Sequence, residues 1–343
     1  MFGFIGKRLY NWCDYPGGWR LFCAMTKCKA GGDIKALILG GCGFIGGHVV
    51  QAFAEQGVQT VVWDLHADPA HSTPCCTYLK GDLSDIEKID AMLAQHSITH
   101  VVHLVSTTLP KSSNENKPYD VHSNVISTLH LLDLCVRHRV QRLLFMSSGG
   151  TVYGDPQKLP IDESHPNNPL CSYGITKLTI EKYLFLYYRL YGLQYVALRA
   201  ANPYGPGQNP FSAQGIVATI VHKMHMGESL EVWGDGSNVR DYFHVRDLSR
   251  LTRKALFSDV TGVYNAGSGV GISVNEIISL IARVGNFVPN VVYRKKRTLD
   301  ASSIILDCTV AKSKFDWAPR VSLRHGIMGY LNWYRLNFIS NEK

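Results

Sequence analysis

A tyrosine and a lysine four residues apart are the first side chains in the sequence that could do chemistry. Tyr173 and Lys177 stand in the segment SYGITK, at the start of a stretch with amphipathic helical spacing. Residues four apart share one face of a helix, so the Lys177 ammonium can lie beside the Tyr173 phenol and stabilise its anion. A free phenol has a pKa of about 10, and it needs such a neighbour to act as a base at neutral pH. The pair therefore indicates a tyrosinate that removes a proton from a substrate hydroxyl.

A glycine-rich segment gives the second chemical signal. It reads GGCGFIGGHVV and fits both Gly41-x-Gly43-x-x-Gly46 and Gly40-x-x-Gly43-x-x-Gly46. Such glycines are needed where a tight turn, a pyrophosphate and a helix packed on a strand leave no space for a Cβ. Asp64 follows 18 residues after Gly46, at the end of the next β-branched run. A carboxylate there accepts hydrogen bonds from the adenosine ribose and repels a 2′-phosphate, so the sequence predicts NAD and not NADP.

The elements that must position these residues alternate between short apolar runs and longer helical stretches. The apolar runs cover 35–39, 60–64, 99–105, 142–148 and 195–200, and the helical stretches cover 45–56, 84–96, 118–138 and 172–192. This is the spacing of βαβ units, and strands that are apolar on both faces imply a parallel sheet covered by helices on either side. The predicted fold is α/β, with a doubly wound parallel (Rossmann) sheet.

The alternation of short apolar runs and helical stretches ends after about residue 201, where a glycine- and proline-rich loop begins. We expect an NAD-binding domain over 33–201 and a smaller, mainly substrate-binding region over 202–343. Residues 240–269 are expected to return to the NAD-binding domain. Doubly wound proteins usually place substrate specificity beyond the carboxyl ends of the sheet.

Further segments give the chain a specific resemblance. They are GDLSD (81–85), HLVS (103–106), SSGGTVYG (147–154), LRAANPYGPGQ (198–208), WGDGSNVRDYFHVRDL (233–248), YNAGSG (264–269) and FDWAP (315–319). From residue 34 to about 335 the chain resembles extended short-chain dehydrogenases/reductases of the NAD-dependent epimerase/dehydratase family, especially the UDP-glucose 4-epimerases.

The resemblance implies a set of binding residues. For NAD these are Gly40, Gly43, Phe44, Ile45, Gly46, Asp64, Asp82 at the adenine, Leu83 and Lys177. For the substrate it implies Asn202 at the sugar nucleotide, and Arg240 and Arg297 at its diphosphate. Two guanidiniums from different segments suit a pyrophosphate. Alternatively, Arg240 could pair with Asp241 or Asp247, and Arg297 could be a solvated charge.

One position departs from the family pattern. The family places a Ser or Thr four residues before the Tyr of its VYG segment, to hold the reacting hydroxyl, and here that position is Gly149. Ser148 and Thr151 are the candidates to replace it. We prefer Ser148, because a small backbone adjustment in the Gly-Gly turn could bring its hydroxyl to the same point. Dehydratases and uronate decarboxylases of the family carry carboxylates in this segment, whereas Gly150 and Thr151 stand here, which disfavours elimination and decarboxylation.

The implied reaction is NAD-dependent 4-epimerisation of a nucleotide-linked hexose through a 4-keto intermediate. The resemblance also makes Ile304, seven residues beyond Arg297, a gate for the sugar's C2 substituent. Because Ile is intermediate in size, UDP-glucose/UDP-galactose and the N-acetyl pair are both expected substrates. The alternatives are a nucleotide-sugar 4-ketoreductase or dehydrogenase, and a non-catalytic binding module, which the presence of Tyr173 and Lys177 disfavours.

Composition excludes several other classes. Of 343 residues, 45% are apolar and 18% are charged, which is typical of a globular chain rather than a disordered one. The net charge is +8, but residues 1–30 carry +4 of it. The nearly balanced remainder argues against a nucleic-acid partner. The nine cysteines have no CxxC or Cys/His spacing, so we expect free thiols in a reducing cytoplasm and no bound metal.

Residues 1–32 precede the resemblance and form an N-terminal extension. They hold seven aromatic residues and the excess positive charge, a mixture suited to an anionic membrane surface. Because Pro16-Gly17-Gly18 interrupts any long helix, contact with a membrane should be weak and peripheral. A disordered tail, or a natural start at Met25, is the alternative. A homodimer is expected as well.

Overall fold

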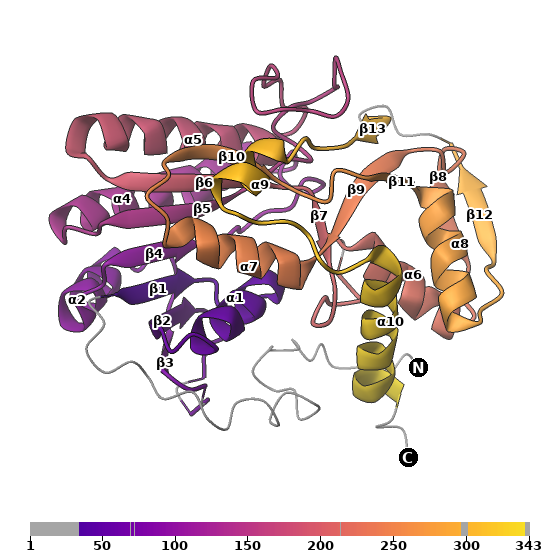
Figure 1. Ribbon diagram of the computed structural model, residues 1–343, viewed down its shortest axis with the longest axis horizontal. Helices are drawn as coiled ribbons and strands as arrows, with labels where there is room; N and C mark the ends of the chain where they lie inside the picture. Colours follow the sequence, from indigo (N-terminus) through magenta and orange to yellow (C-terminus); the bar gives the residue numbers. More distant parts are fainter. Residues whose placement is uncertain (1–33, 69, 72, 213, 296–300, 340–343) are drawn as a thin grey trace.

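A seven-stranded parallel sheet forms the centre of the molecule (Figure 1). The structure is a computed structural model that describes residues 34–68, 70–71, 73–212, 214–295 and 301–339. The strand order is β10-β6-β5-β4-β1-β2-β3. The strands are β1 Lys35–Leu39, β2 Gln59–Asp64, β3 Cys76–Lys80, β4 His100–His103, β5 Arg142–Ser148, β6 Gln194–Ala200 and β10 Gly262–Ala266. The strand order reverses between β1 and β4, which is where doubly wound folds bind ligands.

Helices cover both faces of this sheet, because its strands are apolar on both sides (Figure 1). One face packs against α1 Phe44–Ala54, α7 Val245–Leu256 and α9 Thr309–Lys314. The other packs against α2 Ile86–His96, α4 Ser127–Arg137 and α5 Ser172–Tyr191. Each layer has its own apolar core, and Leu37 and Ile38 of β1 point into opposite ones. The expected doubly wound α/β fold is confirmed.

A smaller part of the molecule builds a third core beyond the carboxyl ends of the large sheet. Its helices are α6 Ile216–His225, α8 Val274–Gly285 and α10 Leu323–Tyr334, which ends in the π-helical turn η3 Arg335–Ile339. Its strands are β7 Asn202–Tyr204, β8 Leu230–Trp233, β9 Val239–His244, β11 Gly271–Ser273, β12 Val291–Arg294 and β13 Ser303–Ile304. They form a four-stranded sheet centred on β9 and a two-stranded pair of β8 with β12.

The chain passes between these two parts more than once. After β9 it returns to the large sheet, where α7 packs against α1 and β10 pairs with β6. Strand β9 itself belongs to the small sheet. The division into a cofactor-binding and a substrate-binding domain remains a proposal.

Two local details were not predicted from the sequence. The edge strand β3 has only Tyr78 fully buried, so it lacks the apolar run that identified its neighbours. The helical stretch predicted over 118–138 consists of α3 Lys117–Asp120, a π-helical turn η2 Val121–Ile126 and then α4. The π-turn inserts an extra residue into the helical repeat, which changes the faces that the residues before it present.

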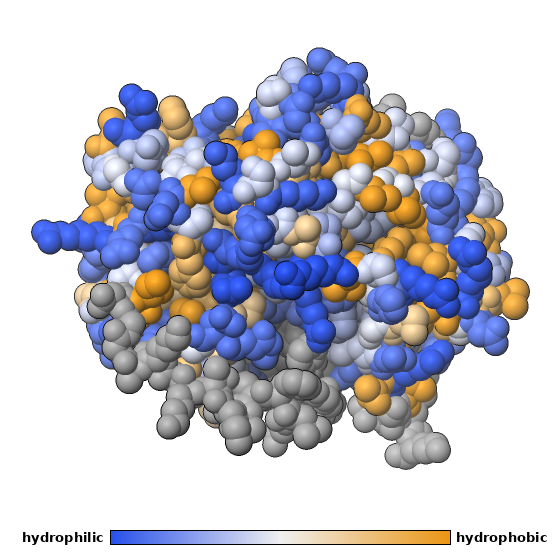
Figure 2. Space-filling model, in the orientation of Figure 1, coloured by the Kyte–Doolittle hydropathy of each residue, from blue (hydrophilic) through white to orange (hydrophobic). Residues whose placement is uncertain are grey.

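On the face shown in Figure 2, hydrophilic side chains gather over α7. Its outer positions are basic, with Arg246 exposed and Arg250 and Lys254 half-buried. In the described residues no helix is long and apolar enough to cross a membrane. The predicted membrane contact of residues 1–32 lies outside the described residues.

The described cysteines depart from the expectation at one position. Cys135, Cys171 and Cys308 have free thiols. Cys75 forms a disulfide bond, so the expectation of free thiols throughout is wrong there.

Candidate active site

The glycine-rich segment forms the turn between β1 and α1. Gly40 has φ +82°, a conformation that glycine adopts without strain. A Cβ on Gly46 would lie 2.1 Å from the Gly40 carbonyl oxygen, so only glycine lets the helix start this close to the turn. Gly43 is the N-cap of α1 and caps it with no side chain. The first N–H groups of α1 therefore have no side-chain cap, and uncapped N–H groups at a helix N-terminus can bind a pyrophosphate.

Asp64 ends β2 beside this turn. Its Oδ2 accepts from the Cys42 N–H at 3.0 Å and its Oδ1 accepts from the His66 N–H at 2.9 Å. These bonds fix the half-buried carboxylate, whose remaining lone pairs can accept from ribose hydroxyls. Asp82 follows β3 and accepts from the Ser84 N–H and hydroxyl at 2.8 Å, while Leu83 is buried in the core. The turn and the carboxylate together fit an adenine dinucleotide without a 2′-phosphate.

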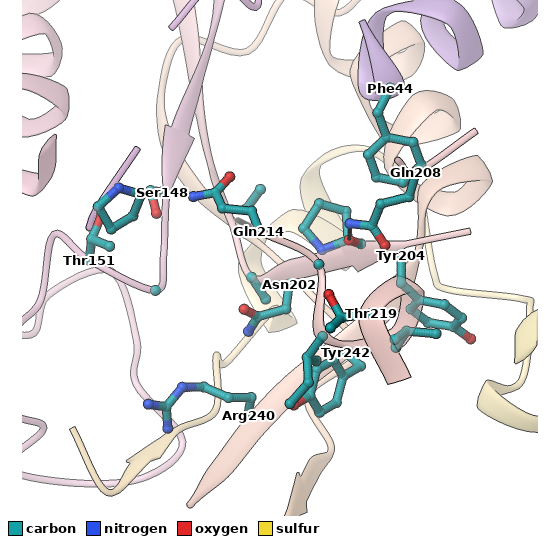
Figure 3. A pocket seen from close by; sticks show the side chains of 18 of the residues that line it. Phe44, Ser148, Thr151, Asn202, Tyr204, Gln208, Gln214, Thr219, Arg240 and Tyr242 are labelled. Carbon is teal, nitrogen blue, oxygen red and sulfur yellow. Dashed lines mark hydrogen bonds between the residues drawn. The ribbon is translucent and has the colours of Figure 1, made fainter. Parts of the chain in front are cut away.

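A cavity of about 600 Å³ runs from this turn to the small sheet (Figure 3). Phe44 and Ile45 of α1 line one end. Ser148, Thr151 and Tyr173 line the wall beyond the end of β5. The smaller part of the molecule contributes Asn202, Tyr204, Gln208, Gln214, Thr219, Trp233, Arg240 and Tyr242 to the wall. Some predicted residues of each kind, namely cofactor, catalytic and substrate residues, thus line a single cavity.

Tyr173 lies in the first turn of α5, and the nearby Ser148 side chain acts to lower its pKa. Lys177 is one turn further on, with its Nζ 5.5 Å from the centre of the Tyr173 ring and donating to the Met146 carbonyl at 3.0 Å. The predicted pair is therefore on one helical face.

The pKa values of this pair differ from the simple expectation. Burial raises the pKa of Tyr173 to about 12, in spite of the Ser148 hydrogen bond, which acts to lower it. Burial also lowers the pKa of Lys177 to about 8, against the charges of Asp120 and Glu181. In the protein alone the pKa of Tyr173 is therefore raised and not lowered as expected, because loss of solvation is the largest cause of the shift.

The turn after β5 shows why Gly149 departs from the family pattern. A Cβ on Gly149 would lie 2.5 Å from Leu306 Cδ1 and 2.9 Å from the Arg199 carbonyl oxygen. A Ser or Thr at position 149 would therefore clash in this backbone. Ser148, one residue earlier, lines the same cavity as Tyr173. The Thr151 hydroxyl is buried at the cavity wall and has no partner in the described part of the chain.

A buried ion pair supports the end of β5. Arg199 donates to both oxygens of the Glu181 carboxylate, with Nη2 to Oε2 at 2.7 Å, and both side chains are almost fully buried. The Ser147 hydroxyl donates to the same carboxylate at 2.5 Å. Strand β5, strand β6 and helix α5 are thereby joined directly below Ser148.

Asn202 and Arg240 come from paired strands of the small sheet. Asn202 on β7 lies opposite Tyr242 on β9, and Arg240 is two residues before Tyr242 on the same face. The Asn202 amide and the Arg240 guanidinium extend in the same direction in Figure 3. The Asn202 amide donates to the Asp241 carbonyl at 3.2 Å, and Arg240 Nη1 donates to the Val239 carbonyl at 2.8 Å.

The alternative partners of Arg240 are engaged elsewhere. The Asp241 carboxylate accepts from Ser268, Gly269 and Leu306, and burial raises its pKa. Asp247 accepts from Arg250 and from the N–H groups of Arg320 and Val321. The alternative of an ion pair between Arg240 and either of these carboxylates is therefore wrong. Arg297, the second predicted diphosphate ligand, lies outside the described residues.

Ile304 is not brought to the cavity. It lies in β13, opposite Arg240 in register, and only 1% of its surface is exposed. Its side chain belongs to the core below the large sheet and not to the cavity wall among the described residues. A gate at this position would have to act through the packing of β13, and it remains a prediction.

Sequence reasoning missed several residues of the cavity wall. They are Tyr204, Gln208, Gln214, Thr219, Trp233 and Tyr242. Most of them stand in segments already noted for their resemblance, and the Gly-Pro composition of 202–210 was a signal for a binding loop. Among the described residues no group of three or more His, Cys, Asp or Glu could hold a metal ion.

Comparisons with known proteins agree with this geometry. Residues 36–267 match the model of the NAD dependent epimerase/dehydratase family. A protein of Halalkalibacterium halodurans named UDP-glucose 4-epimerase is 34% identical over 319 residues, covering 87% of this chain and 95% of the relative.

Solved structures are similar over the same length. UDP-glucose 4-epimerase from Thermotoga maritima with UDP-glucose has a TM-score of 0.84 at 33% identity, covering 88% of this chain and 99% of that one. UDP-glucose 4-epimerase from Thermus thermophilus in complex with NAD has a TM-score of 0.83 at 31% identity, with the same coverage of 88% and 99%. The chain thus belongs to the NAD dependent epimerase/dehydratase family.

Proposed function

We propose that the protein catalyses NAD-dependent 4-epimerisation of a UDP-linked hexose. The observation that carries the proposal is the cavity of about 600 Å³, whose wall includes Phe44 and Ile45 after the glycine turn, Ser148 and Tyr173, and Arg240. Gly150 and Thr151 give the turn beside Ser148 no carboxylate for elimination. Tyr173 with Lys177 beside it suits proton transfer at a sugar hydroxyl.

Residues at different positions along the cavity have different roles in binding and proton transfer. Asn202 binds the sugar nucleotide and Arg240 its diphosphate, which leaves the hexose near Ser148. The Ser148 hydroxyl holds the C4 hydroxyl, and Tyr173 Oη, as phenolate, takes its proton while the Lys177 ammonium stabilises the negative charge. When bound, NAD supplies an acceptor for the C4 hydride and returns it. The 4-keto sugar turns between these transfers, and Tyr173 gives the proton back to the C4 oxygen.

A panel of UDP-hexoses tests this proposal. UDP-glucose, UDP-galactose and their N-acetyl counterparts are incubated with the purified protein, and the products are resolved by chromatography. We expect interconversion of the 4-epimers without net change in NADH. Net consumption of added NADH would instead favour a nucleotide-sugar 4-ketoreductase, and no turnover would favour a binding module.

The range of sugars is part of the proposal. Both the unsubstituted and the N-acetyl pair are expected to react, with Ile304 acting on the C2 substituent. Ile304→Tyr should then lower the ratio of N-acetyl to unsubstituted activity. An unchanged ratio in a folded variant would remove Ile304 from the specificity of the site.

A homodimer is also proposed. It is supported by an unusual number of large apolar side chains exposed on α5, namely Ile175, Phe185, Leu186, Leu190 and Tyr191. Two copies of this face can pack about a twofold axis. Light scattering of the purified protein should give twice the mass of the chain, and Leu190→Lys should shift it toward the monomer; a monomeric wild type would contradict the proposal.

A cytoplasmic location with weak membrane contact through residues 1–32 is the last part of the proposal. It is supported by the aromatic and basic composition of that segment. Deletion of residues 1–30 should abolish co-sedimentation with anionic liposomes and leave turnover intact. Loss of turnover on deletion would show that the segment belongs to the folded enzyme.

A further inference from the structure

The helix that carries Tyr173 begins without a cap of its own. The first N–H groups of a helix have no partner within it, and they are normally satisfied by a nearby side chain. Cys171 is the N-cap of α5 and makes no such bond. Instead, the Ser172 N–H donates to Asn114 Oδ1 at 2.9 Å and the Tyr173 N–H donates to Ser113 Oγ at 3.0 Å. The cap is supplied by a loop 58 and 60 residues earlier in the chain.

Asp120 adds a buried carboxylate to this cap. It ends α3, and none of its surface is exposed. Its Oδ2 accepts from the Ser172 hydroxyl at 2.6 Å, and its Oδ1 accepts from the Thr108 hydroxyl at 2.5 Å and from Asn124 Nδ2 at 3.0 Å. In the described part of the chain it has no ion-pair partner. Burying such a charge costs several kcal/mol unless it is well hydrogen-bonded. The presence of this carboxylate at the start of α5 therefore indicates a function for its charge.

The charge of Asp120 acts on both members of the catalytic pair. It opposes the effect of burial on the pKa of Lys177 and adds to the raised pKa of Tyr173. The other groups that face the Lys177 ammonium are Glu181, which also raises its pKa, His103, the Phe145 and Tyr173 rings and the Met146 carbonyl. Since the Glu181 carboxylate is already paired with Arg199, Asp120 is the carboxylate near Lys177 without a cation of its own among the described residues.

We propose that Asp120 is a positioning residue: with Ser113 and Asn114 it fixes the first turn of α5, and its charge keeps Lys177 as an ammonium beside Tyr173. The inference rests on the proposed function, because it requires Tyr173 to be the base. It also links the cap to the cavity, since Pro110 of the capping loop lines the cavity wall.

Asp120→Asn removes the negative charge of the side chain but keeps its size and shape. The amide oxygen still accepts from one hydroxyl, and the other hydroxyl can rotate to accept from the amide N–H. We expect kcat to fall roughly 10- to 100-fold, with KM for UDP-glucose changed less than about threefold and bound NAD unchanged. The alkaline limb of the kcat profile should move to lower pH, because Lys177 then loses its proton more readily.

Ser113→Ala removes part of the cap without removing a charge. It should lower kcat about tenfold, leave the alkaline limb in place and accelerate amide hydrogen exchange at Tyr173. Ser112→Ala is the matched control, because the Ser112 hydroxyl bonds only to the Leu109 backbone among the described residues. If Asp120→Asn fails to fold, Ser172→Ala tests the same bond with the carboxylate retained, and it should also lower kcat with little change in KM.

The outcomes distinguish this inference from the proposed function. Wild-type kcat and an unmoved alkaline limb in folded Asp120→Asn would overturn the inference. So would unaltered exchange at Tyr173 in Ser113→Ala. Absence of epimerisation by the wild-type protein would instead overturn the proposed function, and the exchange measurement would still report on the cap.

Discussion

The two ends of the cavity are built in different ways. The cofactor end comes from one contiguous βαβ unit, in which the turn after β1 and the carboxylate ending β2 lie within residues 40–64. The substrate end is assembled from β7, α6, β8 and β9, which span residues 202–244 and include the long-range pairing of β7 with β9. Local sequence therefore determines the first end, and tertiary packing determines the second. Tyr173 and Ser148 lie where the two ends meet.

The largest effect is expected at this meeting point. Tyr173→Phe removes one oxygen from a side chain whose ring can remain in place. We expect kcat to fall by about 10²- to 10⁴-fold, because proton transfer has no other acceptor at that position. Bound NAD and the thermal midpoint should be unchanged. Tyr191→Phe is the control, since Tyr191 is an exposed tyrosine on the same helix, and turnover in Tyr173→Phe equal to that of this control would refute the role of Tyr173.

The next effect belongs to the cofactor end alone. Asp64→Ala removes the acceptor for the ribose hydroxyls and the two bonds that fix the turn. We expect NAD affinity to fall roughly 10- to 100-fold, as for loss of charged hydrogen bonds, and discrimination against NADP to weaken. Cofactor released by denaturation can be quantified by chromatography. Asp68→Ala, at an exposed neighbouring carboxylate, should retain NAD; equal loss in both variants would show that the effect is structural.

A smaller effect should separate the two hydroxyls near Tyr173. Ser148→Ala is expected to lower kcat by about 10- to 100-fold, because the Ser148 side chain lines the cavity with Tyr173 and acts on its pKa, and Thr151→Ala by only a few-fold. Gly149→Ser in the Ser148→Ala background should not restore activity, since its Cβ would collide with Leu306 and the Arg199 carbonyl. Full rescue by that substitution would show that the family position is still available in this backbone.

The smallest effect tests how the two ends are joined. His48 on α1 is buried, and its Nε2 is hydrogen-bonded at 2.9 Å to the carbonyl of Pro206 in the Gly-Pro-rich loop 202–210. Burial lowers the pKa of His48 to about 3. The unfolded chain, with an ordinary pKa near 6.5, binds the proton first as pH falls. The contribution of neutral His48 to the free energy of unfolding is therefore complete above about pH 6.5. Below this pH the contribution is lost, and the loss is about 1 kcal/mol at pH 5.5.

Urea unfolding at pH 7.5 and 5.5 measures this loss. His48→Gln keeps a donor at the Nε2 position but does not titrate, so it should reduce the pH dependence by that amount. His103 is also buried with a pKa of about 3 and remains in the variant as an internal comparison. An unchanged pH dependence in His48→Gln would show that His48 is already protonated in the folded state.

The same contrast explains what could be predicted from the sequence. The parallel sheet, the glycine turn, Asp64 and the Tyr173–Lys177 face follow from local spacing, and the structure has them as expected. The sequence does not reveal the packing of Leu306 against Gly149, the burial of Ile304 or the engagement of Asp241 and Asp247. Most of these depend on the pairing of β9 with β13 across the small sheet, and the engagement of Asp247 depends on residues 320 and 321 packing beside α7; neither has a local signal. The direction of the Tyr173 pKa shift was also missed, because it depends on how deeply the helix end is buried.

The central claim is that hydride leaves and returns to C4 within one site. It is tested most directly with UDP-[4-²H]glucose in ordinary water, with the UDP-galactose formed analysed by mass spectrometry and NMR. The account predicts that deuterium is retained at C4 of the product, with no net NADH formed. Loss of the label to solvent, or a product that requires added NADH, would contradict it.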